Sequence, residues 1–464
     1  MIQLKEQKIK KLEHMKEFIA AIDLGTTKVV SAIGEKTDSG FRVVALKEAP
    51  SLGVSRGEVL NIQQVMNSLL PTLEEIRLES DYQIKDVYVG IAGQNIRCES
   101  NSNRRNRRRS FDLISEQEIK DMEYEMYKLK VNIGEEVLHV MPQFYNVEDH
   151  MGIVNPVGMT GGQIEGNYKL FIGKKNSAEC SKTVIERAGL KLNRLILEPV
   201  ASAAAVLTED EKEIGVAMID IGGGTTDLLI YHDNIIRHTA VIPFGGNSIT
   251  EDLKTGCGVS AKTAEQIKIQ YGSCYTEFAP ENKTVIIPGI GGRDSREVSF
   301  KFISNIIEAR VEEILDAVMY EIENSGYQDK LGAGIVITGG SSALTHLVPF
   351  VKFKTGFGAR VVAPAKSITY DSCEAAFKPS SSTAVGLLLN GYDISQEPNL
   401  FESEEEAEEL VLQSDFVAKP VKKASAEREK EKTREKEKST KSKVKDSIFG
   451  AFGSLFDGMN NNDA

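Results

Sequence analysis

Two short segments, whose aspartates lie 197 positions apart, carry the same residue types in the same order. Residues 18–33 read FIAAIDLGTTKVVSAI and residues 216–231 read VAMIDIGGGTTDLLIY. Each has an apolar stretch ending in Asp, a turn with glycine and two threonines, and a second apolar stretch. Glycine lets backbone N–H groups approach phosphate oxygens, and threonine hydroxyls add further donors. The pattern predicts two phosphate-binding β-hairpins.

The charged residues of these hairpins indicate that a nucleotide with Mg²⁺ is bound. Asp23 and Asp220 end buried strands and would hold Mg²⁺ through its waters, because Mg²⁺ prefers carboxylates and retained water. Lys28 lies close enough to its turn to supply positive charge to the β- and γ-phosphates. One such turn would be a weak signal, since glycine turns follow strands in any sheet, but the pair strongly favours a nucleotide site. The remaining predicted phosphate-binding residues are Gly25, Thr26, Thr27, Gly222, Gly223, Gly224, Thr225 and Thr226.

A third element, GAGIVITGGSSAL at residues 332–344, is an apolar strand followed by a Gly-Gly turn and the start of a helix. Taken alone it fits an ordinary βα turn equally well. After the two hairpins, in this order, it suits a turn on which an adenosine rests. The predicted residues are Gly339, Gly340 and Ser341.

The elements that must position these residues belong to an α/β architecture. The first 392 residues or so alternate short β-branched strands, such as residues 18–23, 28–33 and 86–91, with amphipathic helices. Two copies of the hairpin imply two related domains. The 464 residues suffice for two to four domains.

Composition excludes several classes of function. No stretch approaches the roughly 20 consecutive apolar residues of a spanning helix, and the apolar run after the lysine-rich N-terminus is too short for a signal peptide. Five widely spaced cysteines without a C-x-x-C pair fit reduced thiols in a cytoplasmic protein, and the six scattered histidines predict no transition-metal site. The net charge of −12 argues against general nucleic-acid binding.

With their order and spacing, the motifs resemble the actin, Hsp70 and sugar-kinase superfamily. Phosphate loop one is Asp23 to Lys28, a connecting segment is EPVASAAA at residues 198–205, and phosphate loop two is Asp220 to Asp227. Within that superfamily the chain resembles the FtsA family of actin-like bacterial cell-division proteins, over roughly residues 16–392. MPQFYNVEDHMGIVNPVGMTGGQIEG, at residues 141–166, is similar to that family's insertion domain.

The resemblance extends to further residues of the site. FGGNSITEDL and AEQIKIQYG, at residues 244–253 and 264–272, are similar to the family's second nucleotide-binding stretch. The resemblance implies that Glu198 orients the attacking water and that Glu265 and Lys268 lie near the adenosine. The alternative for these three residues is that they are charges on a helix surface. The resemblance also implies that the turn of Gly245, Gly246 and Asn247 lies beside the phosphates, and the alternative is that this turn merely ends a strand.

The fold that the resemblance implies is an actin-like two-domain α/β fold with duplicated ribonuclease-H-like cores, an FtsA-type insertion domain and a disordered C-terminal linker ending in an amphipathic helix. The implied subdomains are 1A at residues 16–98 and 182–214, the insertion domain 1C at 99–181, 2A at 215–244 and 331–392, 2B at 245–330, the linker at 393–445 and the helix at 446–459.

The C-terminal region changes character. Residues 419–445 carry twelve Lys or Arg against five Glu, and cannot bury enough apolar surface to fold. The helix that follows, at residues 446–459, is too short to span a bilayer. We expect it to bind a membrane surface, in preference to packing in the core or binding a protein groove, because the long charged linker precedes it. Its six apolar residues fall on one stripe: Ile448, Phe449, Phe452, Leu455, Phe456 and Met459.

The resemblance implies a cell-division scaffold, at most a slow ATPase, with ATP and Mg²⁺ as cofactors. It would polymerise at the cytoplasmic face of the inner membrane, as a peripheral protein at the division site. Its partners would be further copies of itself, the tubulin-like FtsZ through residues 245–330, anionic lipid, and later division proteins through the insertion domain. No nucleic acid is expected.

Rival functions remain open at this point. A pilus-assembly actin-like ATPase or a small-molecule kinase would use the same loops, whereas an Hsp70-type chaperone would need a peptide-binding domain for which there is no room. The segment NRRNRRRS at residues 103–110 is read as a solvated loop, with contact to anionic lipid or to an acidic neighbour as the alternative.

Overall fold

The computed structural model describes residues 18–80, 82–287 and 294–396. The predicted terminal helix and its apolar stripe lie outside the described residues, as does the predicted linker from residue 397 on. Within the described ranges, no helix combines the length and the apolar character needed to cross a membrane. All five cysteines lie in these ranges as free thiols.

The first sheet is built around the first predicted hairpin. Its strands are β1 (Phe18–Leu24), β2 (Lys28–Thr37), β3 (Gly40–Pro50), β6 (Asp86–Ile91) and β11 (Lys191–Leu197). They lie in the order β11-β6-β1-β2-β3, where β1, β2 and β3 pair antiparallel while β6 and β11 continue the sheet in parallel with β1.

The second sheet repeats this arrangement around the second hairpin. Its strands are β12 (Val216–Ile221), β13 (Thr226–His232), β14 (Ile235–Ile242), β17 (Ile335–Thr338) and β18 (Ala359–Val361). Their order is β14-β13-β12-β17-β18, and the directions match those of the first sheet strand for strand. The duplicated core predicted from the paired hairpins is therefore confirmed.

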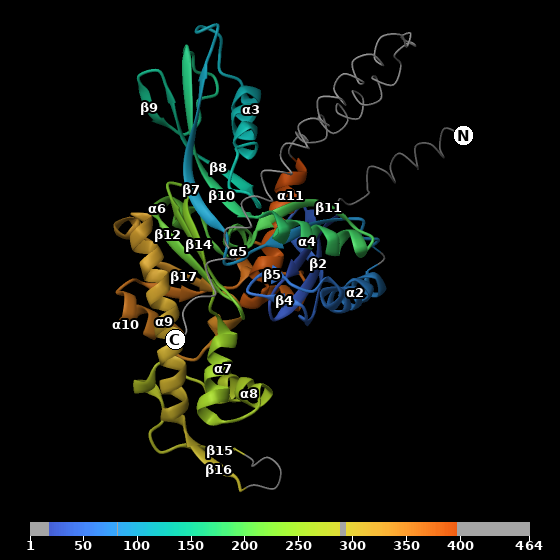
Figure 1. Ribbon diagram of the computed structural model, residues 1–464, viewed down its shortest axis with the longest axis vertical. Coiled ribbons are helices and arrows are strands. Elements are labelled where there is room, and N and C mark those ends of the chain that lie inside the picture. Colours follow the sequence, from blue (N-terminus) through green and yellow to red (C-terminus); the bar gives the residue numbers. More distant parts are fainter. Residues whose placement is uncertain (1–17, 81, 288–293, 397–464) are drawn as a thin grey trace, which may run out of the picture. The chain divides into compact units, whose positions relative to one another are not determined.

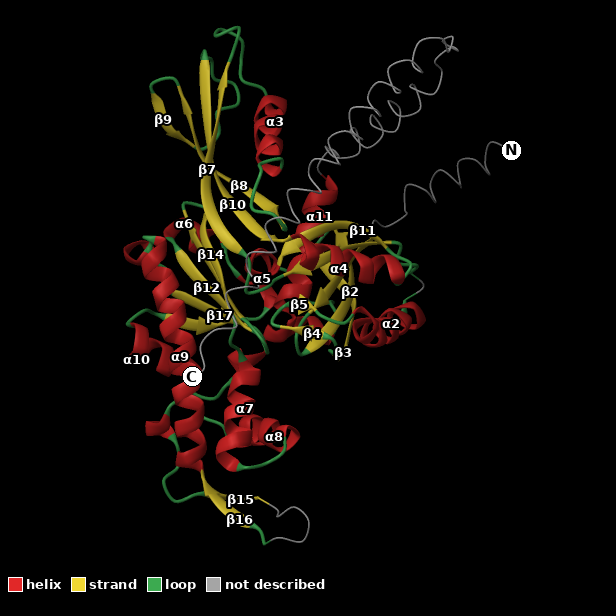
Figure 2. Ribbon diagram, in the orientation of Figure 1, coloured by secondary structure: helices red, strands yellow, loops and turns green. Residues whose placement is uncertain are grey.

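Helices fill the space between the sheets and cover their outer faces (Figures 1 and 2). Helices α5 (Glu198–Val206) and α11 (Ser382–Gln396) lie between the two sheets, in one apolar core that both sheets share. Helices α2 (Ile62–Glu79) and α4 (Lys175–Arg187) cover the outer face of the first sheet, and α9 (Phe300–Ser325) and α10 (Leu347–Thr355) that of the second.

An insertion leaves the first half between β6 and α4. Its strands are β7 (Arg97–Asn106), β8 (Glu135–Val147), β9 (His150–Ile153) and β10 (Gln163–Lys174), in the antiparallel order β7-β10-β8-β9, with helix α3 (Glu116–Tyr127) packed against them. Met122 and Met126 of α3 share a core with Tyr145 and Tyr168 of the sheet. The insertion therefore has a hydrophobic core of its own.

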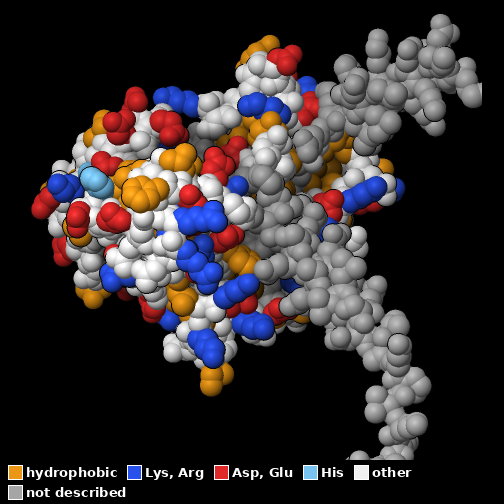
Figure 3. Space-filling model, turned by 90° about the horizontal axis from the view of Figure 1, so that it is seen from above, with side chains coloured by type: hydrophobic (Ala, Val, Ile, Leu, Met, Phe, Trp, Pro, Cys, Tyr) orange, Lys and Arg blue, Asp and Glu red, His pale blue; other side chains and the backbone are white. Residues whose placement is uncertain are grey.

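The arginine segment is a solvated loop only in part. Residues 103–106 belong to β7 and meet acidic partners within the insertion, as the alternative prediction had it, whereas residues 107–110 lie outside any strand and Arg108 and Arg109 are exposed. Arg104 pairs with Glu165 at 3.0 Å, and Arg105 with Glu125 at 2.6 Å. These ion pairs supply the counter-charge that clustered arginines require. On the face seen in Figure 3, basic and acidic side chains lie interspersed.

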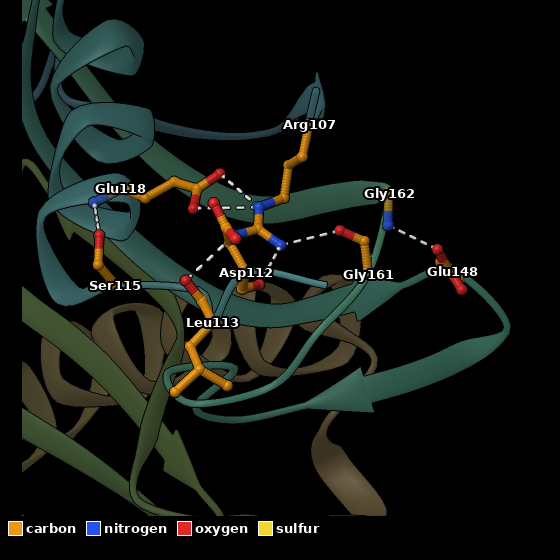
Figure 4. Close-up of polar contacts among 8 residues, drawn as sticks. All are labelled: Arg107, Asp112, Leu113, Ser115, Glu118, Glu148, Gly161 and Gly162. Carbon is orange, nitrogen blue, oxygen red and sulfur yellow. Dashed lines mark hydrogen bonds and ion pairs between the residues drawn. The ribbon is translucent and has the colours of Figure 1, made fainter. Parts of the chain in front are cut away.

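Arg107 is the most buried of these arginines, with 8% of its side chain exposed. Figure 4 shows its guanidinium between Glu118 of α3, at 3.0 Å, and three backbone carbonyls at 2.8 to 3.1 Å. Those carbonyls belong to Asp112, Leu113 and Gly161. Arg107 therefore ties together the loops at one end of the insertion.

The insertion also contacts the second sheet. The Gln143 side chain on β8 donates a buried 2.8 Å hydrogen bond from Nε2 to the Ile236 carbonyl on β14. Because β14 is an edge strand, its outward backbone groups need such partners. The insertion is thus joined to one half by the chain and to the other by this contact.

The second half carries an extension between β14 and β17 that contains α7 (Gly246–Cys257), α8 (Ala261–Tyr271), β15 (Thr284–Ile287), β16 (Arg296–Ser299) and α9. Ser260 and Ser299 accept hydrogen bonds from backbone N–H groups at the starts of α8 and α9, as N-cap residues do. Other short elements are β4 (Val54–Ser55), β5 (Glu58–Val59), α6 (Glu209–Ile214) and the 3-10 helices η1 (Thr276–Phe278), η2 (Gln328–Lys330), η3 (Gly340–Ala343), η4 (Pro364–Lys366), η5 (Glu374–Phe377) and η6 (Pro379–Ser381).

Candidate functional site

A cleft of about 780 Å³ opens where the turns of the two hairpins face each other. Most of the predicted site residues line it: Asp23, Gly25, Thr26, Thr27, Lys28, Glu198, Asp220, Gly222, Gly223, Gly224, Thr225, Gly246, Asn247, Glu265, Lys268, Gly339, Gly340 and Ser341. Two predicted residues lie behind the lining. The Thr226 hydroxyl is buried and donates to the Phe244 carbonyl at 2.8 Å, and Gly245 is the N-cap of α7.

Four carboxyl groups gather in this cleft because two strands end there and another strand and a helix begin there. Asp23 lies near the end of β1, and Asp220 lies near the end of β12. Asp227 on β13 is directly opposite Asp220 in the hairpin register, so the two side chains share one face of the sheet. Glu198 begins α5, and its side chain passes over Gly90, where an added Cβ would lie 2.9 Å from Glu198 Cγ.

Burial is the main reason why these carboxyl groups hold their protons unusually tightly. It raises the pKa of Asp23 to about 6, an effect that Lys28 opposes and Asp220 reinforces. It raises the pKa of Glu198 and of Asp227 well above the ordinary range, and neighbouring carboxylates add to the effect. Burial also raises the pKa of Asp220, but the hydrogen bond that Ser202 donates to its Oδ2 at 2.6 Å opposes the rise. Lys28 is the lysine that partly offsets this effect at Asp23 and Asp220.

The carboxyl cluster fits a hydrated cation. Asp227 Oδ1 is buried and accepts no hydrogen bond within the described residues. Among those residues no three His, Cys, Asp or Glu side chains converge closely enough to ligate an ion directly. Such an arrangement fits Mg²⁺ that keeps its waters and meets the carboxylates through them.

The two glycine turns approach each other so closely that side chains larger than hydrogen cannot fit. A Cβ on Gly223 would lie 1.7 Å from Thr27 Oγ1, and one on Gly224 would lie 2.6 Å from Thr26 Oγ1. The first N–H groups of α7 are held by the second turn, since Asn247 N donates to the Gly223 carbonyl at 2.8 Å. The two turns therefore meet at the cleft, and residues of both line it.

The other end of the cleft is formed by α8 and the turn after β17. Lys268, with 10% of its side chain exposed, donates to the Gly246 carbonyl at 2.9 Å and pairs with Glu265 at 2.8 Å. Both residues face the cleft instead of an open helix surface. Gly339 has φ of +89°, and a Cβ there would lie 2.2 Å from Asp220 Oδ1, so only glycine fits at this turn.

Sequence reasoning missed several residues that line the cleft. Asp227 could have been found, because the length of the hairpin turn places it opposite Asp220. Glu48 could not, because it comes from a third strand whose register the sequence does not fix. Three more come from the start of α11 and the segment before it, which carry no motif: Lys378, Ser380 and Thr383.

Comparison with known proteins identifies the family. Residues 217–386 match the family model "Cell division protein FtsA", and residues 93–172 match "SHS2 domain inserted in FTSA". The cell division protein FtsA of Neisseria meningitidis serogroup B is 37% identical over 391 residues, which cover 81% of this chain and 91% of that protein. The chain belongs to the FtsA family of cell division proteins.

Other similar proteins agree with that family and with its fold. The FtsA proteins of Pseudomonas aeruginosa and Escherichia coli K12 are 34% and 33% identical, each across 81% of this chain and 89% and 90% of their own lengths. The PilM-PilN type IV pilus biogenesis complex has a TM-score of 0.56 at 16% identity, covering 82% of this chain and 99% of that one. MreB 5 of Spiroplasma citri bound to AMPPNP has a TM-score of 0.51 at 15% identity, with 82% and 97% covered. These structures show the actin-like fold alone, and the SHS2 match confirms an FtsA-type insertion domain.

Proposed function

We propose that this protein binds ATP with Mg²⁺ in the cleft and, in that state, forms a polymer on the cytoplasmic face of the cell membrane to which the FtsZ ring attaches. One observation carries the nucleotide part: two glycine turns from duplicated sheets face each other across four carboxyl groups. The family membership supports the division part, and favours it over pilus assembly or small-molecule phosphorylation.

The chain's own residues have separable roles in this proposal. The turn N–H groups and threonine hydroxyls hold phosphate oxygens, while Lys28 balances their charge. Asp23 and Asp220 hold Mg²⁺ through water. When bound, Mg²⁺ neutralises charge on the phosphates. The adenosine rests between α8, which carries Glu265 and Lys268, and the turn after β17.

In this proposal Glu198 orients a water molecule toward the terminal phosphate. A general base works best when its pKa is near the working pH, and burial among carboxylates holds that of Glu198 well above its ordinary range. The buried side chain therefore holds its proton more tightly than an ordinary glutamate does. We therefore expect slow hydrolysis, which suits a polymer switch more than a metabolic enzyme.

The scaffold role uses both halves and the C-terminal region. A nucleotide that contacts both turns favours the closed arrangement of the two halves, and thereby the shape that polymerises. The helix at residues 446–459 would hold the membrane weakly in one copy and firmly in a filament, because each further helix binds intramolecularly. Residues 245–330 would receive FtsZ, and the insertion domain would receive later division proteins.

Two measurements test the proposal. Calorimetry should detect Mg²⁺-dependent ATP binding that Asp220→Ala abolishes in a variant that remains folded. Sedimentation with anionic liposomes should recover the full chain, but leave a chain lacking residues 446–464 in solution with ATP binding intact. Absence of ATP binding by the folded wild-type protein would refute the nucleotide site, and liposome binding by the truncated chain would refute the membrane helix.

A further inference from the structure

Lys28, the lysine beside the first glycine turn, already has an acidic partner inside the cleft. Its Nζ lies 2.6 Å from Glu48 Oε2, and donates a longer hydrogen bond of 3.4 Å to Ser380 Oγ. All three residues line the cleft. Lys28 is 24% exposed and Glu48 is 52% exposed, so the pair lies at the wet side of the cavity, where a ligand can reach it.

The sheet fixes this pair. In the antiparallel register of β2 and β3, Val30 is opposite Glu48, so Lys28 is the diagonal neighbour of Glu48 on the same face. Diagonal neighbours lie within reach of long side chains. Just beyond, Ser51 N donates to the Thr27 carbonyl at 2.9 Å, which fastens the end of β3 to the turn. The pair is therefore positioned by the same strands that form the phosphate turn.

The charge of Lys28 reaches the carboxyl cluster, where it lowers the pKa of Asp23 and opposes the rise in the pKa of Asp220. Lys268, in contrast, is occupied by the Gly246 carbonyl, Thr250 and Glu265. A triphosphate entering the cleft therefore competes with Glu48 for Lys28. The carboxylate it displaces stays nearby and repels the added negative charge.

We propose that Glu48 is a positioning residue that holds Lys28 while the cleft is free of nucleotide and must yield it when phosphates bind. Glu48 thereby sets the nucleotide concentration at which the site fills. This inference rests on the proposed function, because it concerns the same cleft and the same phosphates.

The test compares dissociation constants for Mg·ATP by calorimetry in Glu48→Gln, which keeps the shape of the side chain and removes its charge. We expect binding to tighten by about threefold to tenfold, since the variant loses both an exposed ion pair and a repulsion. The gain should shrink in high salt, which screens both. Glu79→Gln is the matched control. Glu79 forms an ion pair with Lys47, which precedes Glu48 on β3, and neither residue of this pair lines the cleft. This variant should therefore bind Mg·ATP like the wild type.

A second pair of variants separates competition from simple repulsion. In a Lys28→Met background, where Glu48 has no ammonium to hold, adding Glu48→Gln should give less than half of the gain in Mg·ATP affinity seen in the wild-type background. Weaker or unchanged Mg·ATP binding by Glu48→Gln alone would overturn the proposal, because Glu48 would then support Lys28 or have no effect on binding. An undiminished gain in affinity in the Lys28→Met background would overturn it too. Wild-type protein that is folded but binds no Mg·ATP would overturn the proposed function and this inference together, whereas a failure confined to Glu48 leaves the proposed function standing.

Discussion

Asp23 gives the most direct test of the electrostatics of the cleft. The residue is 8% exposed, near the end of β1 and beside the other carboxyl groups. Replacing it by asparagine keeps its size and polarity but removes a charge that the fold must otherwise bury. We expect Asp23→Asn to stabilise the nucleotide-free protein at neutral pH.

The magnitude follows from the pKa, which burial raises from 3.8 to about 6. A folded-state pKa above the unfolded value means that the folded protein binds the proton more tightly. The contribution of Asp23 to the free energy of unfolding is therefore fully present below pH 4 and is lost as pH rises through about 6. A pKa difference of about 2 units between the folded and unfolded states corresponds to about 3 kcal/mol of unfolding free energy. The wild type loses this stability above pH 6, and the variant does not.

Thermal unfolding from pH 4 to pH 8 measures this difference without nucleotide. The variant should unfold at the wild-type temperature near pH 4 and about 5 °C higher above pH 6. Asp86→Asn, which changes an exposed aspartate at the start of β6, should show no such divergence. A shift that is the same at every pH, or a variant less stable than the wild type at pH 8, would refute the reasoning. Mg·ATP should stabilise the wild type and leave Asp23→Asn unchanged.

Three further predictions concern packing and contact. Gly223→Ala should weaken Mg·ATP binding roughly tenfold or more in calorimetry, because its Cβ meets the opposite turn, whereas Gly358→Ala, whose Cβ meets nothing within 4 Å, should bind normally. Arg107→Ala should destabilise the insertion by about 3 kcal/mol and speed its cleavage in limited proteolysis, while the exposed Arg108→Ala should not; equal cleavage of the two variants would contradict this role. Gln143→Ala should cost about 1 kcal/mol locally and speed amide exchange in β14, and unchanged exchange there would show that the contact is dispensable.

The hairpins were predictable because their signal is local. A strand ending in Asp, a glycine turn and a second strand are all contained within 16 residues, and the structure places the turns where the sequence predicts them. Residues named through the family resemblance, such as Glu198 and Lys268, also line the cleft, although no local pattern marks them.

The remainder depended on contacts between distant parts of the chain. Glu48 reaches the cleft only through the β2–β3 register. The first half of the arginine segment lies in β7, which pairs with β10, and glutamates on β10 and α3 supply its counter-charge. The Gln143 contact joins a strand of the insertion to an edge strand of the other half. Residue spacing and composition cannot predict these contacts, because strand register and sheet packing determine which distant residues meet.

The two repeats were enlarged at different connections. The first carries its extra sheet between its fourth and fifth strands, β6 and β11, whereas the second carries α7 to α9 between its third and fourth, β14 and β17. Neither enlargement interrupts the turn between the first two strands, which is only residues 25–27 in one repeat and 222–225 in the other. The extra elements thus lie away from both short turns. A reporter domain grafted at the β8–β9 bend should therefore be tolerated, whereas a single residue added to either short turn should not.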